Sequence, residues 1–313
     1  MNILITGASG LIGTAIIKKL QSQDHKIYAI SRSNKKSNGN INWIKHDLYN
    51  DSVSSLILPK KIDVVFYLSG QTSIYDAREN PIFDLNANVL GFLNLLEYFK
   101  SQKQKPFVVL AGTATEVGIV DLLPINEKTQ DRPITFYDLS KLTAEMYLKQ
   151  YIREGWARGC TLRLANVFGR SQKQQLEDRG IVDKIFRRAL AKKNITVFGD
   201  GNYIRDYVFI DDVVMAFILS EQFSVKTNGL TFYIGSGEGI ALKDAFQEII
   251  YLAAKLTGKT VSCEHVKPPD NLSEIEFRDA IIDSSAFTNL TGWKPRYSFT
   301  EGLDIAYKNY FDK

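Results

Sequence analysis

The chain has 313 residues, of which 44% are hydrophobic, and it carries a formal net charge of +4. This length suffices for a large buried core, while the charge is too small and too evenly spread to indicate nucleic acid as a partner. Two cysteines exclude a disulfide framework, and because neither a signal peptide nor an apolar run of membrane-spanning length is evident, we expect a cytoplasmic protein without a membrane partner.

The first predicted element is a short strand that ends at Thr6 and leads into a glycine-rich turn. Gly7, Gly10 and Gly13 come next at regular intervals, and apolar residues then recur at helical spacing. Such a turn needs glycine where the backbone bends, where it approaches a diphosphate and where helix packs on strand. The N-terminus of the helix after the turn would hold the phosphates of a dinucleotide. A tight turn without a ligand is the alternative, and the position between strand and helix disfavours it.

Strands and helices are predicted to alternate along the first half of the chain. Apolar runs predict strands at 26–30, 41–45, 62–68, 106–111 and 160–167, and helical spacing predicts helices from 85 onward and over 136–152. This alternation indicates an α/β fold with a doubly wound parallel sheet. The later segments lack it. We therefore predict a dinucleotide-binding domain made of 1–167 and 205–223 and a smaller, interleaved C-terminal substrate-binding domain made of 168–204 and 224–313.

The residues directly after the second predicted strand bear on the choice of cofactor. A chain that binds NAD would usually offer Asp or Glu to the adenosine ribose there, whereas this one has Ser31 and Arg32 with two lysines close behind. Arginine can pair with a 2′-phosphate, so the residues favour NADP(H) over NAD(H). The alternative is that these charges are a solvated loop and NAD(H) binds without a ribose carboxylate. Asp47 and Leu48 are placed to meet the adenine.

A second motif contains candidate catalytic residues. Tyr137 and Lys141 lie four residues apart at the start of a predicted helix, so both side chains emerge on one face. A free tyrosine has a pKa near 10, and an ammonium beside it would favour the phenolate. Thr113, just past the fifth strand, is placed to hydrogen-bond the same substrate oxygen, giving a proton-transfer site. Two amphipathic surface residues are the alternative. The three histidines are isolated, and we expect no metal site.

These motifs resemble those of the extended short-chain dehydrogenases/reductases that act on nucleotide sugars. The resemblance spans nearly the whole chain and implies a Rossmann sheet with a nucleotide-sugar-binding domain. It is carried by TGASGLIG at the glycine turn, by YDLSK (137–141), and by the later segments LRLANVFG (162–169), FGDGNYIRDYVFIDD (198–212), YIGSGEG (233–239) and TGWKPRYSFTEGL (291–303).

The resemblance also implies roles for individual residues. Tyr137 would be the catalytic acid/base, Lys141 would orient the nicotinamide ribose and lower the tyrosine pKa, and Thr113 would polarise the sugar oxygen. The residues expected to bind the cofactor are Gly7, Ser9, Gly10, Leu11, Ile12, Gly13, Ser31, Arg32, Asp47, Leu48, Leu68, Ser69, Gly70, Asn88 and Val167. Those expected to bind the substrate are Gln71, Ser73, Thr115, Asn166, Val197, Arg205 and Arg278.

The planar guanidinium group of arginine can bind phosphate oxygens through two hydrogen bonds, which suits the expected diphosphate contacts of Arg205 and Arg278. Their alternative role is structural ion pairing with Asp206 or Asp279. Members of the family commonly form a homodimer through two long helices of each subunit, the helices that begin here near 85 and 137. We expect the same four-helix bundle here. The alternative, which periodicity alone does not exclude, is that the apolar residues of these helices belong to the core of one subunit.

Departures from the family pattern reduce the number of reactions that we expect this chain to catalyse. Dehydratases place Asp and Glu directly after the catalytic threonine, where this chain has Ala114 and Thr115, so dehydration is disfavoured. Glu116 lies one residue beyond, and a bulge could aim it at the substrate. The leading hypothesis is an NADPH-dependent reductase of a 4-keto sugar on a nucleoside diphosphate, such as a 4-keto-6-deoxyhexose for deoxysugar and surface-polysaccharide biosynthesis. An NAD-dependent nucleotide-sugar 4-epimerase is the second hypothesis, and a non-catalytic dinucleotide sensor the third.

Overall fold

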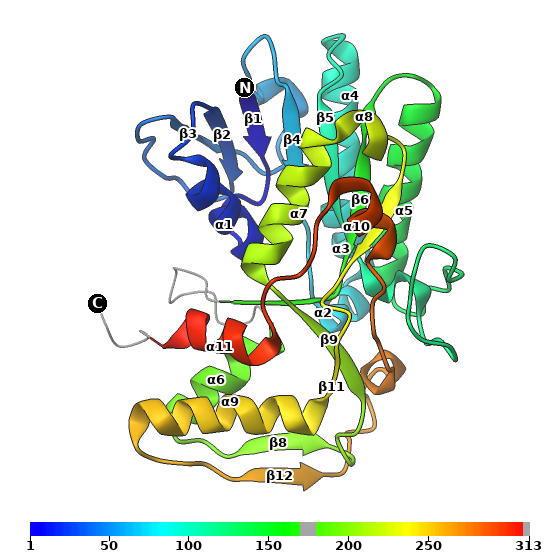
Figure 1. The fold of residues 1–313 in the computed structure, drawn as a ribbon. Helices are drawn as coiled ribbons and strands as arrows, with labels where there is room; N and C mark the ends of the chain where they lie inside the picture. Colours follow the sequence, from blue (N-terminus) through cyan, green and yellow to red (C-terminus); the bar gives the residue numbers. More distant parts are fainter. Residues whose placement is uncertain (170–179, 309–313) are drawn as a thin grey trace.

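The computed structural model describes residues 1–169 and 180–308, and within these ranges seven strands form one sheet (Figure 1). Every neighbouring pair in it is parallel, in the order β10-β6-β5-β4-β1-β2-β3. The order reverses beside β1, which places a ligand crevice at the carboxyl ends of β1 and β4. The expected doubly wound α/β fold is confirmed. The strands are β1 (Asn2–Ile5), β2 (Lys26–Ser31), β3 (Ile41–Lys45), β4 (Val64–Tyr67), β5 (Phe107–Thr113), β6 (Arg158–Leu164) and β10 (Thr231–Ile234).

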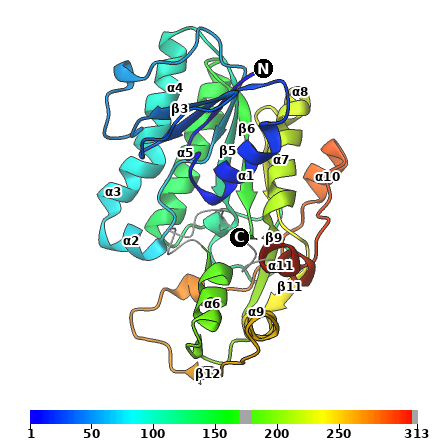
Figure 2. The ribbon, with the colours of Figure 1, turned by 90° about the vertical axis from the view of Figure 1, so that its left-hand side faces the viewer.

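Helices cover both faces of the sheet, as the two views show (Figures 1 and 2). The helices on one face are α1 (Leu11–Leu20) and α7 (Ile210–Gln222), and those on the other are α4 (Gly91–Ser101) and α5 (Phe136–Arg153). Alternate residues of a strand therefore enter different cores: in β4, Val64 and Phe66 pack with α1 and α7, while Val65 and Tyr67 pack with α4 and α5. This explains why the strand reads as a continuous apolar run. Short helices α8 (Ser224–Thr227) and α10 (Ser285–Thr291) lie near β6 and β10.

A smaller layer lies beyond the carboxyl edge of the main sheet (Figure 1). Its aromatic and aliphatic residues form a core of their own, centred on Phe186, Phe246 and Tyr307. The helices around it are α6 (Ile181–Leu190), α9 (Leu242–Thr257) and α11 (Phe299–Tyr307). The strands are β8 (Ile195–Phe198) with β12 (Cys263–Val266), and β9 (Ile204–Phe209) between β7 (Asn166–Phe168) and β11 (Gly239–Ala241).

Two strands, β10 and β9, belong to different sheets from those that we predicted. β10 pairs with β6, so the main sheet takes a strand from the predicted substrate segment 224–313. β9 pairs with β7 and β11, so the chain rejoins the main layers only at α7 and not from residue 205. Both strands are short and largely buried, and their sequences carry no signal that separates one sheet from the other. The division into two domains otherwise stays a prediction.

Candidate active site

The glycine turn between β1 and α1 fits a dinucleotide phosphate. Gly7 has a φ of +58°, and a Cβ there would lie 2.6 Å from the carbonyl oxygen of Leu68. A Cβ on Gly13 would lie 2.6 Å from the carbonyl oxygen of Gly7. α1 begins after Gly10 with no side-chain cap and no acidic residue in its first turn. Its first N–H groups are therefore left for an anion, as phosphate binding at a helix N-terminus requires.

The loop after β4 is fastened against this turn. The buried hydroxyl of Thr6 accepts hydrogen bonds from the amides of Leu68, at 3.0 Å, and Ser69, at 3.1 Å. A Cβ on Gly70 would lie 2.3 Å from Oδ1 of Asn88, so this loop and Asn88 are in close contact. Asn88 lies in a π-helical turn (Asn86–Leu90) before α4. The expected cofactor residues of both loops thus meet at the same edge of the sheet.

The expected cofactor residues at the ends of β2 and β3 differ in burial and in their contacts. Ser31 is buried, 3.4 Å from the Ser9 hydroxyl of the glycine turn, while Arg32 is exposed. The carboxylate of Asp47 accepts a 3.2 Å hydrogen bond from the side chain of Asn50 within its own turn. Leu48 is buried in the core beneath α4. Leu48 therefore supports this edge of the site from below.

The three predicted catalytic residues come together at the carboxyl end of β5 and the start of α5. Thr113 is the last residue of β5, and its side chain lies near the phenol of Tyr137, the second residue of α5. α5 begins here because the Thr135 hydroxyl caps it by accepting from the amide of Asp138 at 3.1 Å. Lys141 comes one turn later and is buried. Their catalytic roles stay predictions.

The charges around the phenol oppose its ionisation. Burial and the carboxylates of Asp138, Glu116 and Asp84 raise the pKa of Tyr137, while the hydrogen bond with Thr113 acts in the other direction. Burial also lowers the pKa of Lys141. The residues of the chain thus shift the tyrosine pKa upward, in contrast to the lowering that we expected from Lys141. The positive charge of an oxidised nicotinamide would act in the favourable direction.

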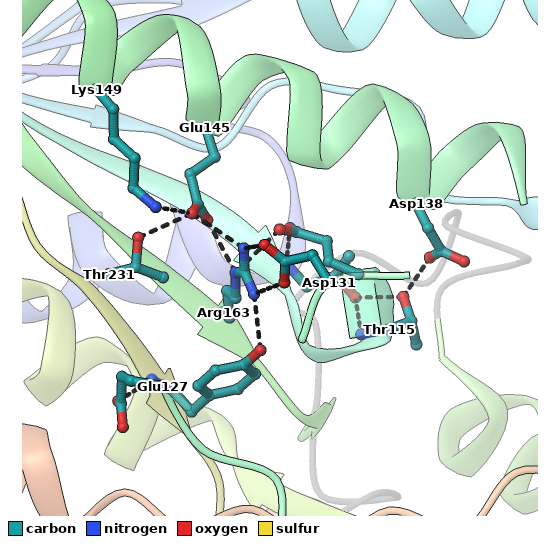
Figure 3. Close-up of polar contacts among 11 residues, drawn as sticks. Thr115, Glu127, Asp131, Asp138, Glu145, Lys149, Arg163 and Thr231 are labelled. Atoms are coloured by element: carbon teal, nitrogen blue, oxygen red, sulfur yellow. Dashed lines mark hydrogen bonds and ion pairs between the residues drawn. The ribbon is translucent and has the colours of Figure 1, made fainter. Parts of the chain in front are cut away.

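Glu116 does not point toward a substrate. Its Oε1 accepts from the amide of Thr113 at 2.9 Å, closing a capping box in a 3₁₀ turn (Ala114–Val117), and its Oε2 lies 3.0 Å from Nε of Arg163. Arg163 also contacts Glu145 and Asp131 (Figure 3). Burial, only partly offset by Arg163, raises the pKa of Glu116 to about 8. The bulge that could have re-aimed this carboxylate at the sugar is absent from the described turn.

The raised pKa of Glu116 predicts how the stability of the protein depends on pH. A carboxyl whose pKa is near 8 when folded and near its ordinary value when unfolded binds an extra proton in the folded state between those values. Stability therefore falls as pH rises through this window. The variant Glu116→Gln has no ionisable group at this position, so its stability should not show this decline. The melting temperature of the variant minus that of wild type, measured by calorimetry, should therefore increase from pH 5 to pH 9. A difference that is constant with pH would contradict the raised pKa.

Two predicted substrate arginines lie side by side in the second half of the chain. The guanidinium of Arg205 donates to backbone carbonyl groups, including that of Glu276 at 2.6 Å, and to that of Arg278. Burial and the neighbouring Arg205 lower the pKa of Arg278 to about 10. In the described part of the chain neither makes an ion pair with a carboxylate within 4.0 Å. The alternative of pairing with Asp206 or Asp279 is therefore wrong.

The other predicted substrate residues are dispersed. Gln71 and Ser73 hydrogen-bond each other, and Ser73 caps a short helix, α2 (Ile74–Glu79), which precedes α3 (Pro81–Leu85). Asn166 donates to the carbonyl of Asp206 at 3.1 Å, which fixes β7 to β9. Val197 is only 1% exposed in the core of the smaller layer, so its side chain cannot line a site. Buried and exposed residues alternate along β8, and this pattern does not distinguish a core position from a site position.

Sequence reasoning missed three groups. The Tyr207 phenol is buried beside Arg205 and Arg278, and its oxygen has no hydrogen-bond partner among the described residues. Asp138 and Asp84 are buried close to Tyr137. A charged residue directly after the tyrosine of YDLSK was the available signal for Asp138. Tyr207 alternates with core residues in β9 and carried no signal.

Comparison with known proteins identifies the family. Residues 3–235 match the family described as the NAD dependent epimerase/dehydratase family, which takes in well over half of the chain. The chain belongs to that family. A putative UDP-glucose 4-epimerase of Methanocaldococcus jannaschii is 27% identical over 305 residues, which cover 96% of this chain and 95% of that protein. The UDP-glucose 4-epimerase of Mycolicibacterium smegmatis is 26% identical, with 97% and 96% covered. The crystal structure of a UDP-glucose 4-epimerase from Thermotoga maritima with UDP-glucose has a TM-score of 0.86 and 29% identity, covering 99% of each chain.

Membership of the epimerase/dehydratase family bears on the cofactor. The family is described as NAD dependent, which gives no support to the preference for NADP(H) that we inferred from Arg32. The exposure of Arg32, and the position of the Lys35 ammonium 3.9 Å from the ring centroid of Trp43, agree instead with a loop of solvated charges. Within 1–169 and 180–308, no helix has the length and apolar character needed to cross a membrane.

Proposed function

We propose that this protein is an NAD-dependent 4-epimerase of a nucleoside-diphosphate hexose. Among the relatives at 26–29% identity that span nearly its whole length, three carry the name UDP-glucose 4-epimerase, one of them as putative, and one is named a dTDP-4-dehydro-6-deoxyglucose reductase, so a uridine diphosphate hexose is the first substrate to test. The leading expectation of 4-keto reduction is replaced by the second hypothesis, because it depended on the NADP(H) preference.

The observation that carries this proposal is the position of Thr113, at the end of β5, near Tyr137, at the start of α5, on the edge of the sheet where the glycine turn lies. A phenol and a hydroxyl in contact can pass a proton to or from a sugar hydroxyl bound beside them. Nicotinamide bound in the crevice supplies reversible hydride transfer at the same sugar carbon. Tyr137 would accept the hydroxyl proton through Thr113 and return it after the keto sugar has turned its other face.

The paired arginines support a diphosphate-linked sugar. Burial lowers the pKa of both guanidinium groups, and Arg205 lowers that of Arg278 further, so an anion beside them would stabilise their charged forms. Neither arginine makes an ion pair with a carboxylate within 4.0 Å among the described residues. The unpartnered phenol of Tyr207 adds a hydrogen-bond donor there. Dehydration finds no base, because Glu116 is turned inward toward Arg163. Epimerisation needs only the groups that are present.

The test is interconversion of UDP-glucose and UDP-galactose by the purified protein with NAD. We expect conversion of one sugar to the other, monitored by chromatography, with no net change in nicotinamide absorbance. Stoichiometric oxidation of added NADPH by a 4-keto nucleotide sugar, without interconversion of the hexoses, would show the reductase instead. Thermal-shift screening of other nucleotide sugars would identify the carrier, because a bound ligand raises the melting temperature.

We propose further that the protein is a homodimer through α4 and α5. Leu139 and Met146 are seven residues apart on α5 and are 51% and 61% exposed, next to Tyr147, which is also exposed. Such a stripe on a helix facing solvent is typical of an interface. Wild type should have the mass of a dimer by light scattering, and Leu139→Glu should yield monomers. Val225→Glu, at a residue 88% exposed on α8, is the control and should stay dimeric. A monomeric wild type would refute the interface.

A further inference from the structure

The segment that joins β12 to α10 lies over Arg205, one of the two arginines of the candidate site. It runs from the smaller layer toward α2 and contains a short 3₁₀ turn, Glu274–Phe277 (Figures 1 and 2). We call residues 271–279 the strap. The guanidinium of Arg205 donates hydrogen bonds to the strap carbonyl groups of Glu276, at 2.6 Å, and of Arg278. Arg205 is only 5% exposed, and the strap is part of what covers it.

The strap is attached firmly to β9 and the residue before it. Besides the two hydrogen bonds from Arg205, the amide of Ile204 donates to the carboxylate of Asp279 at 2.7 Å. The ring of Phe277 packs edge-on against that of Tyr203, with 5.2 Å between the ring centroids. Hydrogen bonds from a buried charged group are among the stronger ones in proteins. We therefore expect this side of the strap to stay in place.

The contacts of the strap with α2 are weaker. The Tyr75 hydroxyl donates to Oε1 of Glu276 over a long distance of 3.4 Å, and Nη1 of Arg78 donates to the carbonyl of Asn271 at 3.1 Å. Both hydrogen bonds are exposed to solvent, and α2 is a helix of only six residues. An exposed hydrogen bond contributes little to stability because water replaces the lost partner. The strap is thus held strongly at β9 and weakly at α2.

We propose that the strap opens at its α2 end to admit and release the nucleotide sugar, and that Tyr75 and Arg78 are positioning residues that hold it closed over the diphosphate. The proposal rests on the function proposed above. The hydrogen bonds give the direction of the motion, because the weaker attachment opens first. They also give its place, because α2 begins directly after Ser73, one of the predicted substrate residues. The opening therefore leads to the part of the crevice where the sugar is expected.

The two arginines take different parts in this motion. Among the described residues, Arg205 donates through three of its five N–H groups to carbonyl groups, which leaves two for a phosphate oxygen while the strap stays attached. Arg278 belongs to the strap, and its guanidinium donates to the carbonyl of Ile275 in the same turn at 2.7 Å. The charge of Arg278 therefore moves with the strap and returns to the diphosphate when the strap closes.

Hydrogen exchange tests the attachment to α2 without a ligand. Arg78→Met removes one contact between α2 and the strap, and Tyr75→Phe removes the other. The loss of one net hydrogen bond corresponds to an increase of about 2- to 10-fold in the open fraction. Strap amides such as that of Glu276, which donates to the carbonyl of Ser273 at 3.0 Å, should exchange faster by the same factor in each variant. Mass spectrometry of peptides from 271–279 measures this rate.

The matched control for hydrogen exchange is Arg188→Met. Arg188 is also an exposed arginine that donates to a backbone carbonyl, that of Asn194 at 2.9 Å, but it lies on α6. Its replacement removes a comparable contact and should leave exchange in the strap unchanged. Equal exchange in wild type and in both α2 variants would overturn the proposal. Faster strap exchange in Arg188→Met as well would also overturn it, because the effect would then be a general loss of stability.

The binding rates of UDP test what the strap does for the proposed function. UDP is passed over the immobilised, NAD-loaded protein, and surface plasmon resonance follows association and dissociation. A larger open fraction raises both rate constants by the same factor, so Arg78→Met and Tyr75→Phe should raise each about 2- to 10-fold with little change in Kd. A weaker Kd with an unchanged association rate would show instead that these residues bind UDP themselves, which contradicts the proposal.

The two measurements separate this proposal from the proposed function. If wild type does not bind UDP, the assignment of a uridine nucleotide fails, and hydrogen exchange alone decides whether the strap opens at α2. If UDP binds with the same rate constants in wild type and in both variants, the strap does not control entry, even where its exchange is faster. Should one of the two variants fail to fold, the other one decides.

Discussion

Replacing Tyr137 with Phe is expected to lower kcat for hexose interconversion by about 10²- to 10⁴-fold, the range typical of a lost general acid–base group. The substitution removes the phenol oxygen, which would exchange a proton with the sugar in the proposed mechanism, and leaves the ring. Without it, no phenolate is present to accept the proton of the sugar hydroxyl. The change should appear in kcat and leave the affinity for the nucleotide sugar nearly intact.

The control for this variant is Tyr251→Phe, on the exposed surface of α9. It removes the same atom far from the crevice and should not alter turnover. Retention of activity by Tyr137→Phe, with both proteins folded and loaded with NAD, would show that another group moves the proton. The assignment of the catalytic residues would then be wrong, although the glycine turn and the cofactor site would be unaffected.

Replacing Arg163 with Met is expected to destabilise the protein by about 3–5 kcal/mol, the cost of removing one member of a buried ion pair. The Arg163 guanidinium lies 3.0 Å from Glu116 and 2.9 Å from Glu145, and both carboxylates are fully buried. Burial raises the pKa of Glu145, but Arg163 and Lys149 more than offset it and hold the pKa below the ordinary value. Methionine fills similar space and supplies no charge.

Denaturant unfolding measures this loss, and the control is Arg158→Met on the same strand. Arg158 is exposed, so its replacement should change stability by less than about 0.5 kcal/mol. The loss in Arg163→Met should be smaller at pH 5 than at pH 8, because the stranded carboxylates can then be protonated. An equal loss at both values would indicate that lost packing, and not unpaired charge, is the cause.

The position of this charge cluster links stability to the candidate site. Glu116 holds the amide of Thr113 and Glu145 lies two turns from Tyr137 on one face of α5, so Arg163 ties β6 to both elements that carry the catalytic residues (Figure 3). A substitution here should therefore loosen the approach of Thr113 to Tyr137 as well as lower stability.

The sequence by itself determined the local parts of this protein. The strand, glycine turn and helix of residues 2–20 depend on backbone conformation and on glycine at positions where a Cβ would collide, and both are encoded in a few neighbouring residues. The same holds for Tyr137 and Lys141, whose helical spacing fixes one shared face. The strands β1 to β6 and the parallel arrangement of the main sheet were predictable from apolar runs that alternate with helices.

The tertiary structure alone decided where the charged and polar side chains are directed. Glu116 turns inward because Arg163, far along the chain on β6, offers it a buried charge, and Arg205 is held by carbonyl groups from residues 276 and 278. The pairing of β10 with β6 and of β9 with β7 could likewise not be predicted, since short, largely buried strands fit either sheet. These contacts join residues far apart in the chain, and burial sets their strength, so no local pattern could specify them.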